Sequence, residues 1–416
     1  MFGNFKMFAR FKQICIPHRD LWKILSYAIN RWSNRYVGYM KRRRVAALAI
    51  VSIAALKAAN NVNNSADNKS QRTRINRKDK YIMSLEGKAQ HYLNALKVRW
   101  QQLHEVPGLF AYQLAKSRPN RVLPGQYKFY TELNTDRTLK RRQPQTIDTL
   151  SPKFKPKQFN FNKVDDLEVM MTIDNEQDMG SVQMIINKSP LSKYHTLICP
   201  DVKSNLVQRI TPQALRFCIT FLRNIDDDTM RMGYNSPGAL ASVNHLHFHL
   251  IHMPQKLYID NVKLENLAGS YLYRTTQEMP IQALCVLIAS NDNDEAILEK
   301  VNNVYKLTEW MCQNNIPHNV FVTQDRTPGK QGNLHIFIFA RSTYCVNKDV
   351  TAFNVGFCEL AGFIPLGNEE KMRNLSETVV VQRVQEITGN AMNSVYEQAK
   401  HIVNGTNSTW QLPFIN

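Results

Sequence analysis

The densest group of reactive side chains in this 416-residue sequence is a histidine cluster. Four of the eleven histidines lie between residues 245 and 252, within the run Asn-His-Leu-His-Phe-His-Leu-Ile at residues 244–251. Successive side chains of a β-strand point to opposite faces, so a strand would direct His245, His247 and His249 to one face. The apolar residues between them would bury the other face. The sequence therefore predicts a catalytic face of three imidazoles on a rigid support.

Three kinds of chemistry could use these imidazoles. Zinc binding needs three ligands with supporting partners, and no cysteine pair or His-Glu motif lies nearby. A neutral imidazole can instead attack phosphorus and form a phosphoramidate, while neighbouring histidines fix its tautomer and protonate the leaving oxygen. A purely structural cluster is the third alternative. The spacing favours nucleophilic catalysis by His247, with no metal and no cofactor.

Groups that could bind phosphate lie around this cluster in the sequence. The segment 233–243 leads into the histidines, and Gly238 permits a tight turn whose amides could contact phosphate oxygens. Charge accumulates on the non-bridging oxygens during displacement at phosphorus, so Lys163 and Arg341 are candidate stabilising cations. Ordinary solvated surface charge is the alternative for both residues.

The elements that must position these groups alternate between strand-like and helix-like patterns. Helical spacing covers residues 84–100, 294–313, 376–387 and 391–403, and Thr211-Pro212 supplies a cap and a first-turn proline for another helix. Alternation predicts strands at residues 182–186, 196–199 and 335–341. The class is therefore α+β, built on antiparallel sheet. Two similar strand-rich halves joined by helices remain an alternative within it.

Charge divides the chain into an extension and a body. Residues 1–60 hold twelve of the 53 basic residues and one of the 34 acidic residues, so the remaining 41 basic and 33 acidic residues give the rest a net charge of about +8. We expect a basic, poorly ordered extension at residues 1–80, an enzyme body at 81–405 and a short tail at 406–416. Without a basic stripe interleaved with aromatics, no nucleic-acid partner is expected.

The compartment is inferred from the cysteines and the extension. Seven cysteines without a Cys-x-x-Cys pair indicate free thiols in a reducing, cytoplasmic compartment. The acid-poor extension leaves a mitochondrial targeting segment as the alternative. Its apolar run at residues 45–56 is too short to span a bilayer, although the extension could contact a membrane surface.

Several blocks, in the same order, resemble a known family. Residues 245–251 satisfy the pattern His-φ-His-φ-His-φ-φ, where φ is apolar, which is typical of the histidine triad superfamily. The wider sequence is similar to the GDP-hexose phosphorylases of that superfamily, over roughly residues 100–390. The further matching blocks are residues 122–125, 133–147, 159–164, 186–200, 233–249, 318–323 and 352–362.

The resemblance implies a fold, a reaction and a set of site residues. The expected fold is a histidine-triad, galactose-1-phosphate-uridylyltransferase-like antiparallel sheet with flanking helices. GDP-glucose and inorganic phosphate are the expected substrates. His247 takes the guanylyl group and releases glucose 1-phosphate, phosphate then releases GDP, and His245 and His249 assist. The candidate nucleotide- and phosphate-binding residues are Asn187, Lys163, Asn235, Gly238, Ser242, Asn244 and Arg341.

Some positions depart from the family pattern. Pro237 and Ala239 replace a leucine and a glycine before the histidines, Phe363 replaces a histidine, and His252 replaces an aromatic residue. These departures leave two alternatives open: a GDP-sugar or dinucleotide hydrolase on the same scaffold, and a nucleotide-binding paralogue with weakened catalysis.

Overall fold

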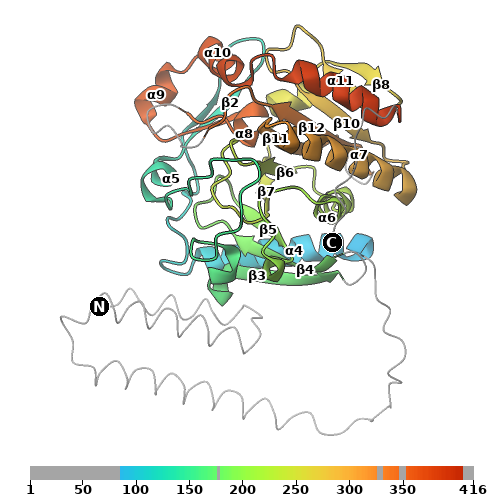
Figure 1. The fold of residues 1–416 in the computed structure, drawn as a ribbon. Coiled ribbons are helices and arrows are strands. Elements are labelled where there is room, and N and C mark those ends of the chain that lie inside the picture. The colour runs from blue at the N-terminus through green and yellow to red at the C-terminus, as the bar shows by residue number, and fades with distance from the viewer. Residues whose placement is uncertain (1–84, 176–178, 326–330, 346–352, 406–416) are drawn as a thin grey trace, which may run out of the picture. The chain divides into compact units, whose positions relative to one another are not determined.

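The computed structural model describes residues 85–175, 179–325, 331–345 and 353–405, which fall within one compact unit. The proposed extension at residues 1–80 and the tail at 406–416 lie outside the described residues. A ten-stranded sheet forms the centre of the unit, with one layer of helices on one face and a mixed layer on the other (Figure 1). Within the described residues, no helix combines the length and the apolar composition needed to cross a membrane.

The large sheet runs in the order β3-β4-β5-β7-β6-β11-β12-β10-β9-β8, and every neighbouring pair is antiparallel. Its strands are built largely from buried β-branched, aromatic and leucine residues, which suit a sheet covered on both faces. Their bounds are β3 Val169–Asn175, β4 Met179–Ile186, β5 Thr196–Pro200, β6 Met230–Asn235, β7 Phe248–His252, β8 Leu264–Ala268, β9 Leu272–Thr275, β10 Leu284–Ile288, β11 His318–Gln324 and β12 Leu334–Ala340.

The sheet consists of two halves with the same topology. In sheet order, β3, β4, β5, β7 and β6 of the first half correspond to β8, β9, β10, β12 and β11 of the second half. In chain order, one long helix precedes the fourth strand of each half: residues 212–223 precede β6, and residues 294–313 precede β11. The registers repeat too: His249 pairs with Leu197 and Gly233, and Phe337 pairs with Cys285 and Phe321. Because Gly233 and Phe321 also pair with each other, a pseudo-two-fold axis passes between them. This axis relates His247 to His335 and His249 to Phe337.

A layer of helices covers one face of the sheet (Figure 1). Residue types explain where several of them begin: the side chains of Thr211 and Asn293 accept hydrogen bonds from first-turn amides, and Pro212 occupies the first helical position. The apolar side chains predicted to form one stripe along residues 294–313 are buried. The helices are α4 Leu85–His104, α6 Pro212–Arg223, α7 Asp294–Gln313 and α11 Met392–Val403.

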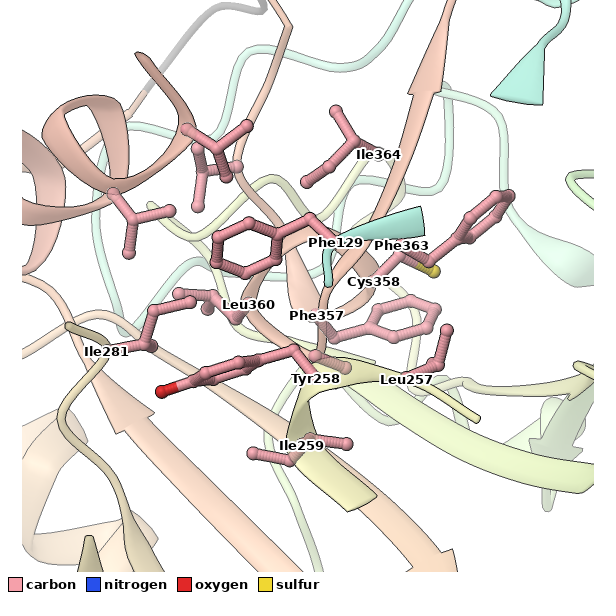
Figure 2. Packing of buried hydrophobic residues seen from close by; sticks show 14 of the residues in the cluster. Phe129, Leu257, Tyr258, Ile259, Ile281, Phe357, Cys358, Leu360, Phe363 and Ile364 are labelled. Atoms are coloured by element: carbon pink, nitrogen blue, oxygen red, sulfur yellow. The ribbon is translucent and has the colours of Figure 1, made fainter. Parts of the chain in front are cut away.

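The opposite face carries a small sheet, short helices and a hydrophobic cluster. The small sheet has the order β1-β2-β13, with Phe363 at the start of β13. Aromatic and aliphatic side chains from this layer, including Phe129, Tyr258 and Phe357, pack together in Figure 2. Phe337 and Cys285 of the second half belong to the same cluster. The elements are β1 Asn120–Val122, β2 Tyr130–Leu133, α5 Thr135–Lys140, α8 Phe357–Leu360, β13 Phe363–Leu366, α9 Glu369–Asn374 and α10 Glu377–Thr388.

Candidate active site

The strand that carries the histidines is shorter than the alternating pattern predicts. Strand β7 begins at Phe248, and His245 lies in a bend before it. The chain turns here because the Leu246 amide donates to the Leu206 carbonyl and the Asn244 side chain accepts from the Gln208 amide. The expectation that a strand directs all three imidazoles to one face was therefore wrong for His245.

The backbone carbonyl of His245 holds His247 in one tautomer. Its Nδ1 lies 2.8 Å from the His245 carbonyl oxygen, which can only accept a hydrogen bond. A neutral ring therefore carries its proton on Nδ1 and a lone pair on Nε2. The fully buried Gln208 fixes the backbone: its Oε1 accepts from the His247 amide at 2.9 Å, and its Nε2 donates to the carbonyls of His247 and Asn235. This arrangement preserves a nucleophilic nitrogen.

His249 is oriented by another buried histidine, His195. The distance between His195 Nε2 and His249 Nδ1 is 3.0 Å, and His195 Nδ1 accepts from the Leu191 amide. Because Nδ1 of His195 accepts, its proton lies on Nε2 and is donated to His249, whose own proton then lies on its Nε2. Burial, followed by the charges of Arg137 and His247, lowers the pKa of His195 well below its usual value, which keeps this ring neutral.

His245 has a structural position. Its ring is fully buried and lies 5.2–5.3 Å from the rings of Phe154 and Phe161, and its Nδ1 accepts from the Phe161 amide at 3.1 Å. Burial lowers the pKa of His245 to about 4. The ring does not line the cavity described next, so it supports the loop that carries Phe161.

A cavity of about 900 Å³ lies against His247 and His249. One wall is apolar, and its aromatic ring Phe161 lies 5.2 Å from the His247 ring. This apolar wall consists of Phe159, Phe161, Val164, Ile185, Leu197 and Val243. The rest of the lining is rich in cations, namely Arg137, Lys140, Arg141, Arg142, Lys163, Lys188 and Lys371. The cavity thus offers a slot for a flat apolar group beside a region suited to anions.

The structure brings four of the seven predicted nucleotide- and phosphate-binding residues to this cavity. They are Asn187, Lys163, Asn235 and Ser242. The Asn187 amide nitrogen lies 3.1 Å from His195 Nε2. The Lys163 ammonium group donates to the Lys157 carbonyl at 2.8 Å.

The other three predicted residues do not line the cavity. The Asn244 side chain accepts a hydrogen bond from the Gln208 amide and donates one to the Lys153 carbonyl. Gly238, at a φ of 71°, lies under the Tyr344 ring. The guanidinium of Arg341 is buried and donates to the Val355 carbonyl.

The departures from the family pattern lie away from the cavity. Phe363 is buried and stacks on Tyr130, with ring centroids 5.7 Å apart. Ala239 is buried and bridges to Cys345, and the Pro237 carbonyl accepts from the Ser236 hydroxyl. His252 packs against Tyr194. None of these four side chains lines the described cavity.

Sequence reasoning missed several residues of the site. His195 and Gln208 lie far from residues 245–249 in the chain, and a single buried histidine or glutamine has no periodic pattern that reveals its partner. Arg137 and Arg141 lie four residues apart, which places them on one side of a helical turn. That spacing was a usable signal. In the described part of the chain, no group of three or more His, Cys, Asp or Glu residues is arranged to hold a metal ion.

Comparison with known families follows this geometry. A family model described as "GDPGP1-like, N-terminal domain" matches residues 92–251, and "GDPGP1-like, C-terminal domain" matches residues 272–404. GDP-D-glucose phosphorylase 1 from Homo sapiens is 34% identical over 305 residues, covering 70% of this chain and 78% of the human protein. The chain belongs to the GDPGP1-like family of GDP-hexose phosphorylases. The resemblance stated from the sequence is confirmed.

A plant relative and a solved structure extend the comparison of this GDP-hexose phosphorylase family member. GDP-L-galactose phosphorylase 2 from Arabidopsis thaliana is 27% identical over 237 residues, covering 52% of this chain and 54% of the plant protein. The crystal structure of yeast Ap4A phosphorylase Apa2 in complex with Ap4A aligns with a TM-score of 0.51 at 16% identity, covering 71% of this chain and 97% of the yeast chain. This likeness concerns the fold, and it confirms the predicted α+β antiparallel architecture.

Proposed function

We propose that this chain is a GDP-D-glucose phosphorylase, which converts GDP-D-glucose and inorganic phosphate into GDP and glucose 1-phosphate. The guanine base and the glucose come from the names of the relatives. The chemistry comes from the site. His247 Nε2 forms a bond to the α-phosphorus of the nucleotide while the bond from phosphorus to the bridging oxygen breaks, and the electron pair leaves with glucose 1-phosphate.

The second half of the reaction returns the enzyme to its starting state. An oxygen of inorganic phosphate bonds to the same phosphorus, the P–N bond breaks, and the lone pair returns to His247. His249, whose Nε2 carries a proton, donates to a phosphate oxygen as negative charge accumulates. The base of the nucleotide fits the apolar wall that includes Phe161.

The observation that carries the proposal is the tautomer of His247. Its Nδ1–H donates to the His245 carbonyl oxygen at 2.8 Å, so the lone pair lies on Nε2 of a ring that lines the cavity. The buried His318 has the same kind of contact, from Nδ1 to the Ile316 carbonyl, but it does not line the cavity; His247 combines this tautomer with a position at the cavity wall beside a second oriented imidazole.

The test is an assay of GDP-D-glucose with and without inorganic phosphate, together with trapping of a labelled guanylyl group. We expect GDP and glucose 1-phosphate to form only with phosphate, and the label to bind the native chain but not His247→Ala. Product formation independent of phosphate would identify a hydrolase instead. Absence of label on a folded native chain that binds GDP would indicate a nucleotide-binding paralogue without this chemistry.

A further inference from the structure

The charge around the cavity is strongly unbalanced. Seven lysines and arginines line it against two carboxylates, Glu168 and Glu359. Lys188 pairs with Glu168 at 3.0 Å, and Lys140 pairs with Asp136 at 2.7 Å. Among the described residues, Arg137 and Arg141 have no ion-pair partner. An anion from solution is therefore the partner that these two guanidinium groups lack.

Arg137 and Arg141 lie at the end of helix α5, where Arg141 is the residue that follows the last turn. Residues four apart face the same side of a helix, and like charges at this spacing repel each other. Burial and the nearby charge of Arg137 both lower the pKa of Arg141, with Glu359 opposing the shift. Two partly buried arginines that lie close together without a paired acid repel each other, and this repulsion disfavours folding. An anion bound between them would offset the repulsion.

A series of neighbouring residues leads from Arg137 to the catalytic histidines. The Arg137 guanidinium donates to the Ser189 carbonyl, and the Ser189 amide donates to Asn187 Oδ1 at 3.0 Å. Asn187 Nδ2 lies 3.1 Å from His195 Nε2, which lies 3.0 Å from His249 Nδ1. Arg137 thus lies on the same cavity as His249 and is linked to it through Ser189, Asn187 and His195.

We propose that Arg137 and Arg141 form one anion subsite that holds the phosphate group next to the attacked phosphorus in both halves of the reaction. This inference rests on the proposed function. The ligand in the first half is the phosphate of the leaving hexose 1-phosphate, and in the second half it is inorganic phosphate. Both ligands are phosphate dianions that bond to the same phosphorus, so one subsite with two planar guanidinium groups serves both.

The test separates phosphate binding from attack by His247. Native enzyme and R141Q are loaded with a labelled guanylyl group, and GDP release is measured over a series of phosphate concentrations. We expect the half-saturating phosphate concentration to rise at least tenfold in R141Q. R141K restores part of the affinity, because it keeps the charge but loses the planar fork. A half-saturating concentration within twofold of the native value in R141Q overturns the proposal.

A matched control and a second measurement keep the two proposals distinguishable. R373Q removes an arginine that is exposed, pairs with Glu369 and does not line the cavity, so it should leave phosphate saturation unchanged. If no guanylyl group can be loaded on native enzyme, the proposed function fails, and the subsite is tested by phosphorus NMR of inorganic phosphate. Line broadening by native protein that is lost in R141Q supports the subsite, and equal broadening by both proteins refutes it.

Discussion

The contact between His195 and His249 makes a specific prediction about tautomers. Asparagine at position 195 can mimic the Nδ1 acceptor for the Leu191 amide, while glutamine can mimic the Nε2 donor toward His249. We therefore expect His195→Asn to lower kcat by about 10- to 100-fold, and His195→Gln to retain more activity. The KM for the nucleotide sugar should change little in either variant. The measurement is steady-state kinetics over pH 6–9 with both variants.

An equal loss of kcat in the two variants, with unchanged pH profiles, would show that His195 acts only through packing. Thermal melting provides the control, because both variants should keep a cooperative transition. His247→Ala is the reference for complete loss of guanylyl transfer.

The sequence predicts both His247 and Arg341 as site residues, and the structure places His247 at the cavity and Arg341 outside its lining. The spacing of the histidines is visible without coordinates, and the chemistry of a neutral imidazole follows from it. Arg341 follows a strand, but a strand pattern does not show which segment packs on the strand's end. The Val355 carbonyl accepts from this guanidinium, a contact between two segments that only the fold brings together.

At the scale of elements, the loop before the histidines depends on Gly238. Its φ of 71° is strained for other residues, and an added Cβ would lie 2.4 Å from the Tyr344 ring. The ring is fixed by the hydrogen bond from the Tyr344 hydroxyl to the Ile147 carbonyl. We expect Gly238→Ala to lower the free energy of unfolding by roughly 2–4 kcal/mol, measured by urea denaturation.

Gly405 is the matched control for this substitution. Its φ is 66°, and an added Cβ there would have nothing within 4 Å. Gly405→Ala should therefore cost only the backbone strain of about 1 kcal/mol. Equal destabilisation by the two substitutions would show that the Tyr344 ring moves away without cost.

Elements with a strong local pattern were predicted well. The helices predicted at residues 294–313 and 391–403 are present as α7 Asp294–Gln313 and α11 Met392–Val403, because apolar periodicity and caps act within one segment. The strand through His245 was wrong because long-range contacts bend the chain before Phe248. The cavity lining contributed by α5 and the segment around Glu359 could not be placed from the sequence, because the spacing of Arg137 and Arg141 indicates a shared helical side but not the element that it faces.

At the scale of the whole molecule, buried neutral histidines set the response to acid. Burial lowers the pKa of His245 and of His318 to about 4, and that of His195 well below its usual value. A lowered histidine pKa in the folded state contributes stability above the unfolded value of about 6.5, and this stability is lost as pH falls toward the folded value.

We therefore expect the free energy of unfolding to fall between pH 6.5 and 4 by up to about 1.4 kcal/mol per pH unit for each such histidine. Urea denaturation over this pH range measures the slope. The slope should be smaller in His318→Asn, which removes one titrating ring that does not line the cavity. An unchanged slope in this variant would contradict the assignment of His318 as a buried neutral group.

The pseudo-two-fold axis between Gly233 and Phe321 relates the half of the sheet that carries His249 to the half that carries Phe337. Where the first half has His249, the second has Phe337, which is buried within the hydrophobic cluster. In the part of the chain that the structure describes, cavity-lining imidazoles therefore occur in one half of the sheet alone. Labelling should saturate at one guanylyl equivalent per chain, and rates should follow a simple hyperbola in substrate concentration, without cooperativity between the halves.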